Sequence, residues 1–268
     1  MIKRILVAIP ALALLVCVIY FHGIYAKIFV GLLCALCVHE MMKAAATGEA
    51  QPIRPIGYAF AALLVPAFIF VGGFTGAMLL YAAAAMAVFI VLVLTNRDAR
   101  DGLITGLPML YPGLLFVFFA AMVCVPKASA SQFLIIIAFA ASVITDTFAY
   151  FTGMLLGKHK LCPKISPKKT IEGAIGGTVF GTAAVALFGA FAQNLFGVNI
   201  AFYWYIVLGL ALAVLTQFGD LSASIIKRKF GVKDFGRIMA GHGGAMDRLD
   251  SVLFISPAVF AFYLIAAL

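Results

Sequence analysis

Apolar residues occur along this chain in long runs that polar residues rarely interrupt. Because roughly 20 consecutive apolar residues in a helix cross the ~30 Å hydrocarbon core of a bilayer, such runs indicate transmembrane helices. We expect nine helices, with approximate bounds 5–21, 28–42, 57–74, 77–94, 104–125, 132–157, 172–196, 200–226 and 249–268. The pattern therefore predicts an all-α polytopic membrane protein with about nine transmembrane helices.

Short polar segments rich in turn-forming residues separate these runs, for example at 51–55, 96–98 and 197–199. None of them is a long polar linker, so we expect a single membrane domain over 1–268. The first run follows Lys3 and Arg4, as the apolar part of a signal peptide would. It lacks a small-residue cleavage motif and more spans come after it, so we interpret it as a first transmembrane helix.

The distribution of positive residues predicts the orientation of the helices. If the N-terminus is cytoplasmic, the segments on that side hold 17 of the 19 Lys and Arg residues, and the other side holds Lys27 and Lys127. Cytoplasmic segments of membrane proteins carry the excess of positive charge. We therefore expect a cytoplasmic N-terminus, a periplasmic C-terminus and two strongly basic cytoplasmic loops, 158–171 and 227–248.

The composition supports a membrane protein. Apolar residues make up 65% of the chain and charged residues 11%, against about 45–50% and about 25% in soluble domains. The net charge of +9 is explained by topology and an anionic substrate, so we expect no nucleic-acid partner. The five cysteines are an odd number, and Cys34 and Cys37 lie inside a predicted helix, which favours buried thiols over a redox or metal pair.

Two predicted spans contain an aspartate near their centre or cytoplasmic end. Ionisable groups inside a membrane are costly and usually mark function, which singles out Asp146 and Asp220. The alternative is an acid that hydrogen-bonds neighbouring hydroxyl groups for packing. A third acid, Glu40, follows His39 near the end of the second span. An interfacial pair and a functional role both stay open for it.

The last cytoplasmic loop combines bases, acids and glycines. Asp247 and Asp250 share one face of the last predicted helix, and Gly243 and Gly244 allow a ligand to approach the backbone. Carboxylates together with a phosphate ligand are the usual way to hold Mg²⁺, and Lys and Arg are the usual partners of phosphates. This mixture indicates metal-assisted phosphoryl or nucleotidyl chemistry.

The earlier loop ends in Ser166-Pro167-Lys168-Lys169. Ser before Pro is typical of a helix start, so we expect a helix N-terminus here that binds an anion together with both lysines. An ordinary capped membrane helix anchored by lysines is the alternative. Glycines at 173, 177 and 181 follow at four-residue spacing, which favours close packing between helices.

These segments resemble the signature of the phosphatidate cytidylyltransferases. The longest match reads Ser224-x-Ile226-Lys227-Arg228, then Lys233-Asp234-x-Gly236, then His242-Gly243-Gly244-x-x-Asp247-Arg248-x-Asp250. Two further matches read Ser166-Pro167-Lys168-Lys169-Thr170-x-Glu172-Gly173 and Asp146-x-x-x-Tyr150-x-x-Gly153. Ala240 and Ala245 depart from the family's usual residues at positions without polar chemistry. The resemblance covers the C-terminal half of the chain.

The resemblance implies a reaction in which CTP and phosphatidate give CDP-diacylglycerol and diphosphate. It implies a multi-pass enzyme of the bacterial inner membrane, a homodimer, and dependence on Mg²⁺ with a second cation such as K⁺. Segment 126–268 would then carry catalysis, and segment 1–125 would face lipid or a second subunit as a scaffold.

The resemblance also assigns roles to individual residues. The expected catalytic residues are Asp220, Asp247, Lys227, Arg228 and Asp250. The expected metal ligands are Asp220 and Asp247, with Asp146 as a further candidate. The expected substrate-binding residues are Lys168, Lys169, Ser166, Thr170, Glu172, Ser224, Lys233, Asp234, His242, Gly243, Gly244 and Arg248.

Two other functions compete with this one. A CDP-alcohol phosphotransferase needs a longer motif than the Asp101-Gly102 present here. An ion-coupled membrane transporter would use Asp146 and Asp220 as an ion path. The chain lacks the paired, inverted halves of many transporters, and its charged loops are concentrated near one end, so the enzyme is favoured.

Overall fold

The computed structural model describes residues 23–46, 49–197, 200–236, 238 and 243–266. Its helices are α2 (Ile24–Ala45), α3 (Arg54–Phe70), α4 (Phe74–Thr95), α5 (Ala99–Pro108), the π-helical segment η1 (Met109–Leu114), α6 (Leu115–Val123), α7 (Ala128–Leu156), α8 (Ile171–Phe196), α9 (Phe202–Lys229) and α10 (Met246–Ile265). One short hairpin consists of β1 (Lys160–Cys162) and β2 (Ser166–Thr170).

Within these described residues, seven helical segments are long and apolar enough to cross a membrane, with α5 to α6 taken as one. The shorter helix α3 is apolar as well. Each of the eight predicted spans from 28–42 onward has a helical counterpart whose ends lie within a few residues of the expected ones. The predicted span 5–21 lies outside the described residues, so the total of nine stays a prediction.

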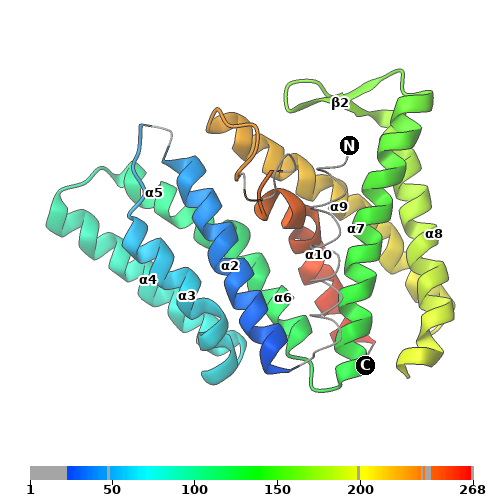
Figure 1. Cartoon of the computed structure of the whole chain (residues 1–268), viewed down its shortest axis with the longest axis horizontal. Coiled ribbons are helices and arrows are strands. Elements are labelled where there is room, and N and C mark those ends of the chain that lie inside the picture. Colours follow the sequence, from blue (N-terminus) through cyan, green and yellow to red (C-terminus); the bar gives the residue numbers. More distant parts are fainter. Residues whose placement is uncertain (1–22, 47–48, 198–199, 237, 239–242, 267–268) are drawn as a thin grey trace. The chain divides into compact units, whose positions relative to one another are not determined.

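The chain divides into two compact units. The first comprises Met1–Cys124 and Lys227–Leu249, and the second comprises Val125–Ile226 and Asp250–Leu268. The basic loop after α9 therefore packs with the N-terminal helices. In the first unit, α2, α3 and α4 run up and down as neighbours, and Figure 1 shows them side by side. Buried aromatic and aliphatic side chains such as Phe60, Leu64 and Phe116 form its core.

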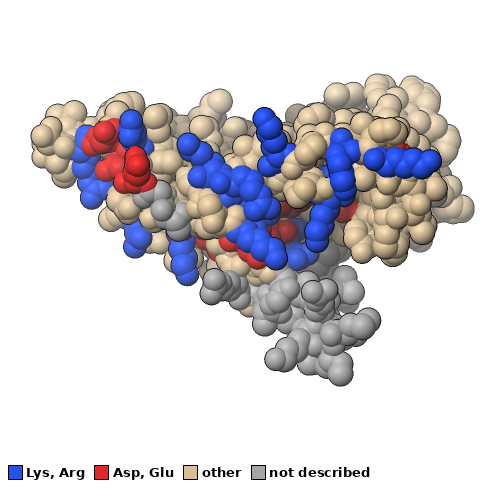
Figure 2. All heavy atoms as spheres, turned by 90° about the horizontal axis from the view of Figure 1, so that it is seen from above, with Lys and Arg blue, Asp and Glu red and all other residues tan. Residues whose placement is uncertain are grey.

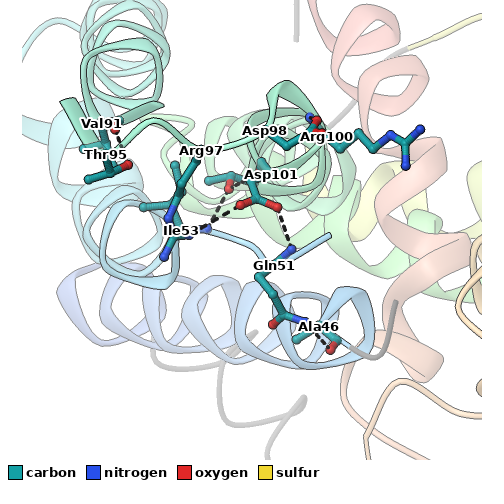
Figure 3. A network of polar contacts seen from close by, with 10 residues as sticks. Ala46, Gln51, Ile53, Val91, Thr95, Arg97, Asp98, Arg100 and Asp101 are labelled. Atoms are coloured by element: carbon teal, nitrogen blue, oxygen red, sulfur yellow. Dashed lines mark hydrogen bonds and ion pairs between the residues drawn. The ribbon is translucent and has the colours of Figure 1, made fainter. Parts of the chain in front are cut away.

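A polar network fixes the connection between α2 and α3 in the first unit (Figure 3). The N–H of Gln51 donates to Oδ1 of Asp101 at 2.8 Å, and the N–H of Ile53 donates to Oγ1 of Thr105 at 2.7 Å. Arg97 forms an ion pair with Asp101 at 3.7 Å. Asp101 thus has a structural role at the start of α5.

In the second unit, α7 and α8 lie antiparallel along most of their length, with the hairpin at one shared end (Figure 1). The predicted packing role of the glycines is confirmed. A Cβ added at Gly177 would lie 2.8 Å from the carbonyl oxygen of Thr145 and 2.8 Å from Cβ of Ala149. A Cβ at Gly209 would lie 2.8 Å from the carbonyl oxygen of Thr182, so α9 approaches α8 as closely.

Within each unit, the charged residues gather at one end of the helices. In the first unit they flank the turns from α2 to α3 and from α4 to α5, and Lys27 lies at the opposite end. In the second unit, five lysines lie on or beside the hairpin, and Lys127 precedes α7 at the other end. Figure 2 shows Lys and Arg side chains on the face that it draws. Which side of the membrane these charged ends face, and with it the cytoplasmic N-terminus, stays a prediction.

The contact between α7 and α8 can be tested with a matched pair of glycine substitutions. Gly177→Ala inserts a methyl group between two backbones, so it should destabilise the protein by about 1–3 kcal/mol. Gly106→Ala places its methyl group where no atom lies within 4 Å, and should be neutral or stabilise by up to about 1 kcal/mol. Thermal unfolding in detergent measures both. Equal unfolding temperatures for the two variants would contradict the close packing.

Candidate active site

The hairpin places the first basic segment on a strand. The expected helix start at Ser166 and Pro167 is wrong, because these residues lie in β2, which pairs antiparallel with β1. Helix α8 begins at Ile171, and Oγ1 of Thr170 accepts the N–H of Gly173 at 3.1 Å. Thr170 is therefore the N-cap. The N-cap is thus four residues later than the expected Ser166. The cause is pairing of β2 with β1, which a local sequence pattern does not predict.

Glu172, in the first turn of α8, stabilises the hairpin through contacts with His159. Its carboxylate accepts the N–H of His159 at 3.2 Å and lies 2.6 Å from Nδ1 of the same residue. The N–H of Ile171 donates to the carbonyl oxygen of His159 at 2.9 Å. These contacts hold the hairpin that carries the lysines, and the expected role of Glu172 in substrate binding stays a prediction.

Lys169 reaches from the hairpin to Asp220 on α9. Its Nζ lies 2.5 Å from Oδ2 of Asp220, and both side chains are partly buried. Asp146 of α7 is close enough to interact electrostatically with both, and it lies within hydrogen-bond reach of Ser251. The second unit thus gathers two acids from its transmembrane helices around one lysine. It brings Asp146, Asp220 and Lys169 together, as a shared functional site requires.

The amide of Gln217 anchors α9 one turn before Asp220. Its Nε2 donates to Oγ1 of Thr178 at 2.9 Å and approaches the carbonyl oxygen of Ala174 at 3.2 Å, both on α8. A buried polar side chain with satisfied hydrogen bonds fixes the rotation of a helix. This contact therefore sets the direction in which Asp220 points.

Asp247 is the centre of a second cluster, in the first unit. Lys227 Nζ lies 2.9 Å from its Oδ1, and the side chains of Lys227 and Asp247 are only 12% and 5% exposed. Oδ2 accepts the N–H groups of Phe235 at 2.8 Å and Gly244 at 3.0 Å. Lys227 also lies 5.4 Å from the ring centroid of Phe235. Asp247 therefore contacts the last turn of α9 through Lys227, and the loop after α9 through Phe235 and Gly244.

A residue whose role the sequence left open joins this cluster. The carboxylate of Glu40 on α2 accepts the N–H groups of Ala245 at 3.1 Å and Met246 at 2.9 Å. The sequence signal was an acid near the end of an apolar span. Its partners lie about 200 residues away, so no local pattern could identify them.

The remaining predicted site residues are distributed between exposed and buried positions. Ser224 is buried on α9. His242 lies outside the described residues. The exposed members are Lys168, Arg228, Lys233, Asp234 and Arg248. Four of these exposed residues are bases, a residue type that commonly binds anions.

No group of three or more His, Cys, Asp or Glu residues is arranged to hold a metal ion in the part of the chain that the structure describes. Mg²⁺ is commonly bound through only one or two carboxylates plus substrate phosphates. The neighbouring carboxylates of Asp146 and Asp220 fit that requirement. Asp247 belongs to the other unit, so its pairing with Asp220 in one metal site stays a prediction.

Comparison with known proteins adds independent information. A model of the Cytidylyltransferase family matches residues 2–266. The chain is 38% identical over 191 residues to a phosphatidate cytidylyltransferase of Bacillus subtilis, a match covering 70% of this chain and 66% of that protein. It is 45% identical over 149 residues to the protein of that name in Staphylococcus aureus (strain COL), covering 55% and 53%. The protein of that name in Staphylococcus saprophyticus is 45% identical over 123 residues, covering 46% of each chain. The chain thus spans about half to two thirds of the length of these curated relatives.

Proposed function

Because the chain belongs to the Cytidylyltransferase family, we propose that it transfers the cytidylyl group of CTP to phosphatidate. The products are CDP-diacylglycerol and diphosphate. The observation that carries the proposal is the family match over nearly the whole chain, joined to two buried or half-buried Lys–Asp pairs. The same match favours an enzyme over an ion-coupled transporter.

The reaction is a displacement at the α-phosphorus of CTP. An oxygen of the phosphatidate phosphate forms a new P–O bond, the bond to the β-phosphate oxygen breaks, and diphosphate leaves with that electron pair. The attacking phosphate monoester is already anionic, so it needs no strong general base. The main barrier is repulsion between two anions, which positive charge fixed at the site would lower.

The Lys169–Asp220 pair is suited to this task through an exchange of partners. With no ligand bound, each charge neutralises the other at a site of limited solvent access. A phosphate at the site would draw Lys169 toward it, and Asp220 would then be the residue to hold a cation. Both groups then stay paired throughout, which avoids the cost of a buried lone charge.

Metal binding is part of the proposal. Asp220 and Asp247 would hold Mg²⁺, with Asp146 beside Asp220 as a further ligand or as an orienting group. Bound Mg²⁺ would neutralise phosphate charge and polarise the α-phosphate. A second cation such as K⁺, which the family resemblance implies, is proposed on that ground alone. Asp250, whose Oδ1 accepts the N–H of Ser251 at 2.7 Å, would orient neighbouring groups.

The basic residues beside the clusters would bind the two anionic substrates. This role is proposed for Lys168, Arg228, Lys233 and Arg248. Ser224, Asp234 and His242 stay predictions as substrate contacts. The apolar helices, and the gathering of charge at one end of the helices within each unit, support a multi-pass protein of the bacterial cytoplasmic membrane, with these charged ends in the cytoplasm. The predicted homodimer remains a prediction.

The direct test is diphosphate release by the purified protein in detergent–lipid micelles. We expect release from CTP with Mg²⁺ only when phosphatidate is present, and a lipid product containing cytidine. ATP and GTP serve as matched nucleotide controls. Release that does not depend on phosphatidate, or that is equal for all three nucleotides, would refute the proposed reaction.

The proposed metal ligands can be tested by isosteric substitution. Asp220→Asn and Asp247→Asn should each lower turnover by about 100-fold or more, because each removes negative charge that would hold the cation. Glu49→Gln is the matched control, since the Glu49 side chain is 95% exposed and should leave turnover unchanged. Turnover near that of the wild type in either aspartate variant would remove that residue from the metal site.

The exchange of partners at Lys169 predicts a difference between two lysines of the hairpin. Lys169→Met should lower turnover by at least about tenfold, because both the phosphate contact and the counter-charge of Asp220 are lost. Lys164 lies at an exposed position on the same hairpin, so Lys164→Met should change turnover less than twofold. Steady-state rates at saturating CTP measure both. Equal losses would indicate general electrostatic attraction by the hairpin.

A further inference from the structure

The carboxylate of Glu40 is buried among backbone atoms of a distant segment. The residue is 2% exposed, although it lies on α2 only a few residues before the helix ends. Its two oxygens accept the N–H groups of Ala245 and Met246, which enter the first turn of α10. Hydrogen bonds from backbone N–H groups to a carboxylate at a helix N-terminus are favourable in both charge and geometry.

The glycines of the loop are explained by this carboxylate. A Cβ at Gly236 would overlap Oε1 of Glu40, and a Cβ at Gly244 would overlap both of its carboxylate oxygens. The loop therefore approaches Glu40 from two sides, at positions where no other residue fits without a shift. Gly243 adopts φ +82°, a conformation that residues with a side chain rarely adopt. Its neighbour Gly244 donates its N–H to Asp247.

Three consecutive backbone N–H groups at the start of α10 are thus engaged by carboxylates. Gly244 donates to Asp247, and Ala245 and Met246 donate to Glu40. A glycine-rich loop before a helix usually offers such groups to a phosphate. Here these three groups have carboxylate partners, so among the described residues at the start of α10 the basic side chains are the better candidates for phosphate recognition.

We propose that Glu40 is a positioning residue that fixes the first turn of α10 and thereby the orientation of Asp247. The catalytic consequence rests on the proposed cytidylyltransferase reaction. Glu40 touches neither nucleotide nor lipid in this account. It acts through the loop backbone: if its carboxylate is lost, the turn at Gly244 relaxes and Asp247 loses one of its two backbone donors. Lys227, which is bound to Asp247, would then shift with it.

The test compares Glu40→Gln with Glu49→Gln, the same change at an exposed site of the same unit. Glutamine has one acceptor oxygen, and its NH₂ group would face a backbone donor. Hydrogen–deuterium exchange of peptides covering 243–250 should become about tenfold faster or more in Glu40→Gln, with no change in peptides of α7 and α8. Glu49→Gln should match the wild type throughout.

Steady-state kinetics then distinguish a positioning role of Glu40 from a role in packing alone. In Glu40→Gln the half-saturating Mg²⁺ concentration should rise about fivefold or more and kcat should fall about tenfold, while KM for phosphatidate stays within about twofold. Faster exchange with unchanged Mg²⁺ dependence and kcat would overturn the positioning role. Unchanged exchange would overturn the contact itself.

Two further outcomes keep the inference separate from the proposed function. If the wild-type protein makes no CDP-diacylglycerol, the proposed function fails, while the exchange comparison still decides whether Glu40 holds α10. If Glu40→Gln does not fold, Gly236→Ala provides the same comparison, because its methyl group would displace the carboxylate. Gly106→Ala is its control, and equal exchange in the two alanine variants would refute the inference.

Discussion

Ionised carboxylates inside a membrane domain must be matched by charge or by hydrogen-bond donors, and this constraint organises the polar part of the structure. Burying an unpaired charge costs several kcal/mol, more than a typical helix contact returns. Three of the buried or half-buried acids meet this requirement in different ways. Asp220 has Lys169, Asp247 has Lys227 with two backbone N–H groups, and Glu40 has two backbone N–H groups.

The sequence predicted the parts of the fold that depend on local patterns. Apolar runs located the helices, because length and hydropathy alone decide what can cross a bilayer. Four-residue glycine spacing predicted that α8 packs closely against a neighbouring helix, and the structure identifies α7 as that neighbour. The hairpin was missed because two strands of three and five residues depend on each other and on Glu172, not on a local preference.

The candidate site was predictable in its residue types and less so in its connections. Asp146 and Asp220 stood out because acids are rare in apolar runs, and Asp247 because it lies among bases and glycines, three residues before Asp250. That Lys169 pairs with Asp220, and Lys227 with Asp247, could not be derived, since several lysines lie at comparable sequence distance from each acid. Glu40 shows the limit most clearly, because its two partners are 205 and 206 residues away and are backbone groups without side-chain identity.

The two Lys–Asp pairs differ in solvent exposure, and this difference suggests different roles for them. Lys169 and Asp220 keep 24% and 32% of their side-chain surface exposed, so a ligand can reach and separate them. Lys227 and Asp247 keep 12% and 5%, and Asp247 also holds two backbone donors. About three of the roughly four lone-pair directions of that carboxylate are thereby engaged. Separating this second pair would also release the loop. Ligand exchange at Lys169–Asp220 is therefore the less costly event, whereas a cation at Asp247 would use the one lone-pair direction that stays open while Lys227 and the loop keep their contacts.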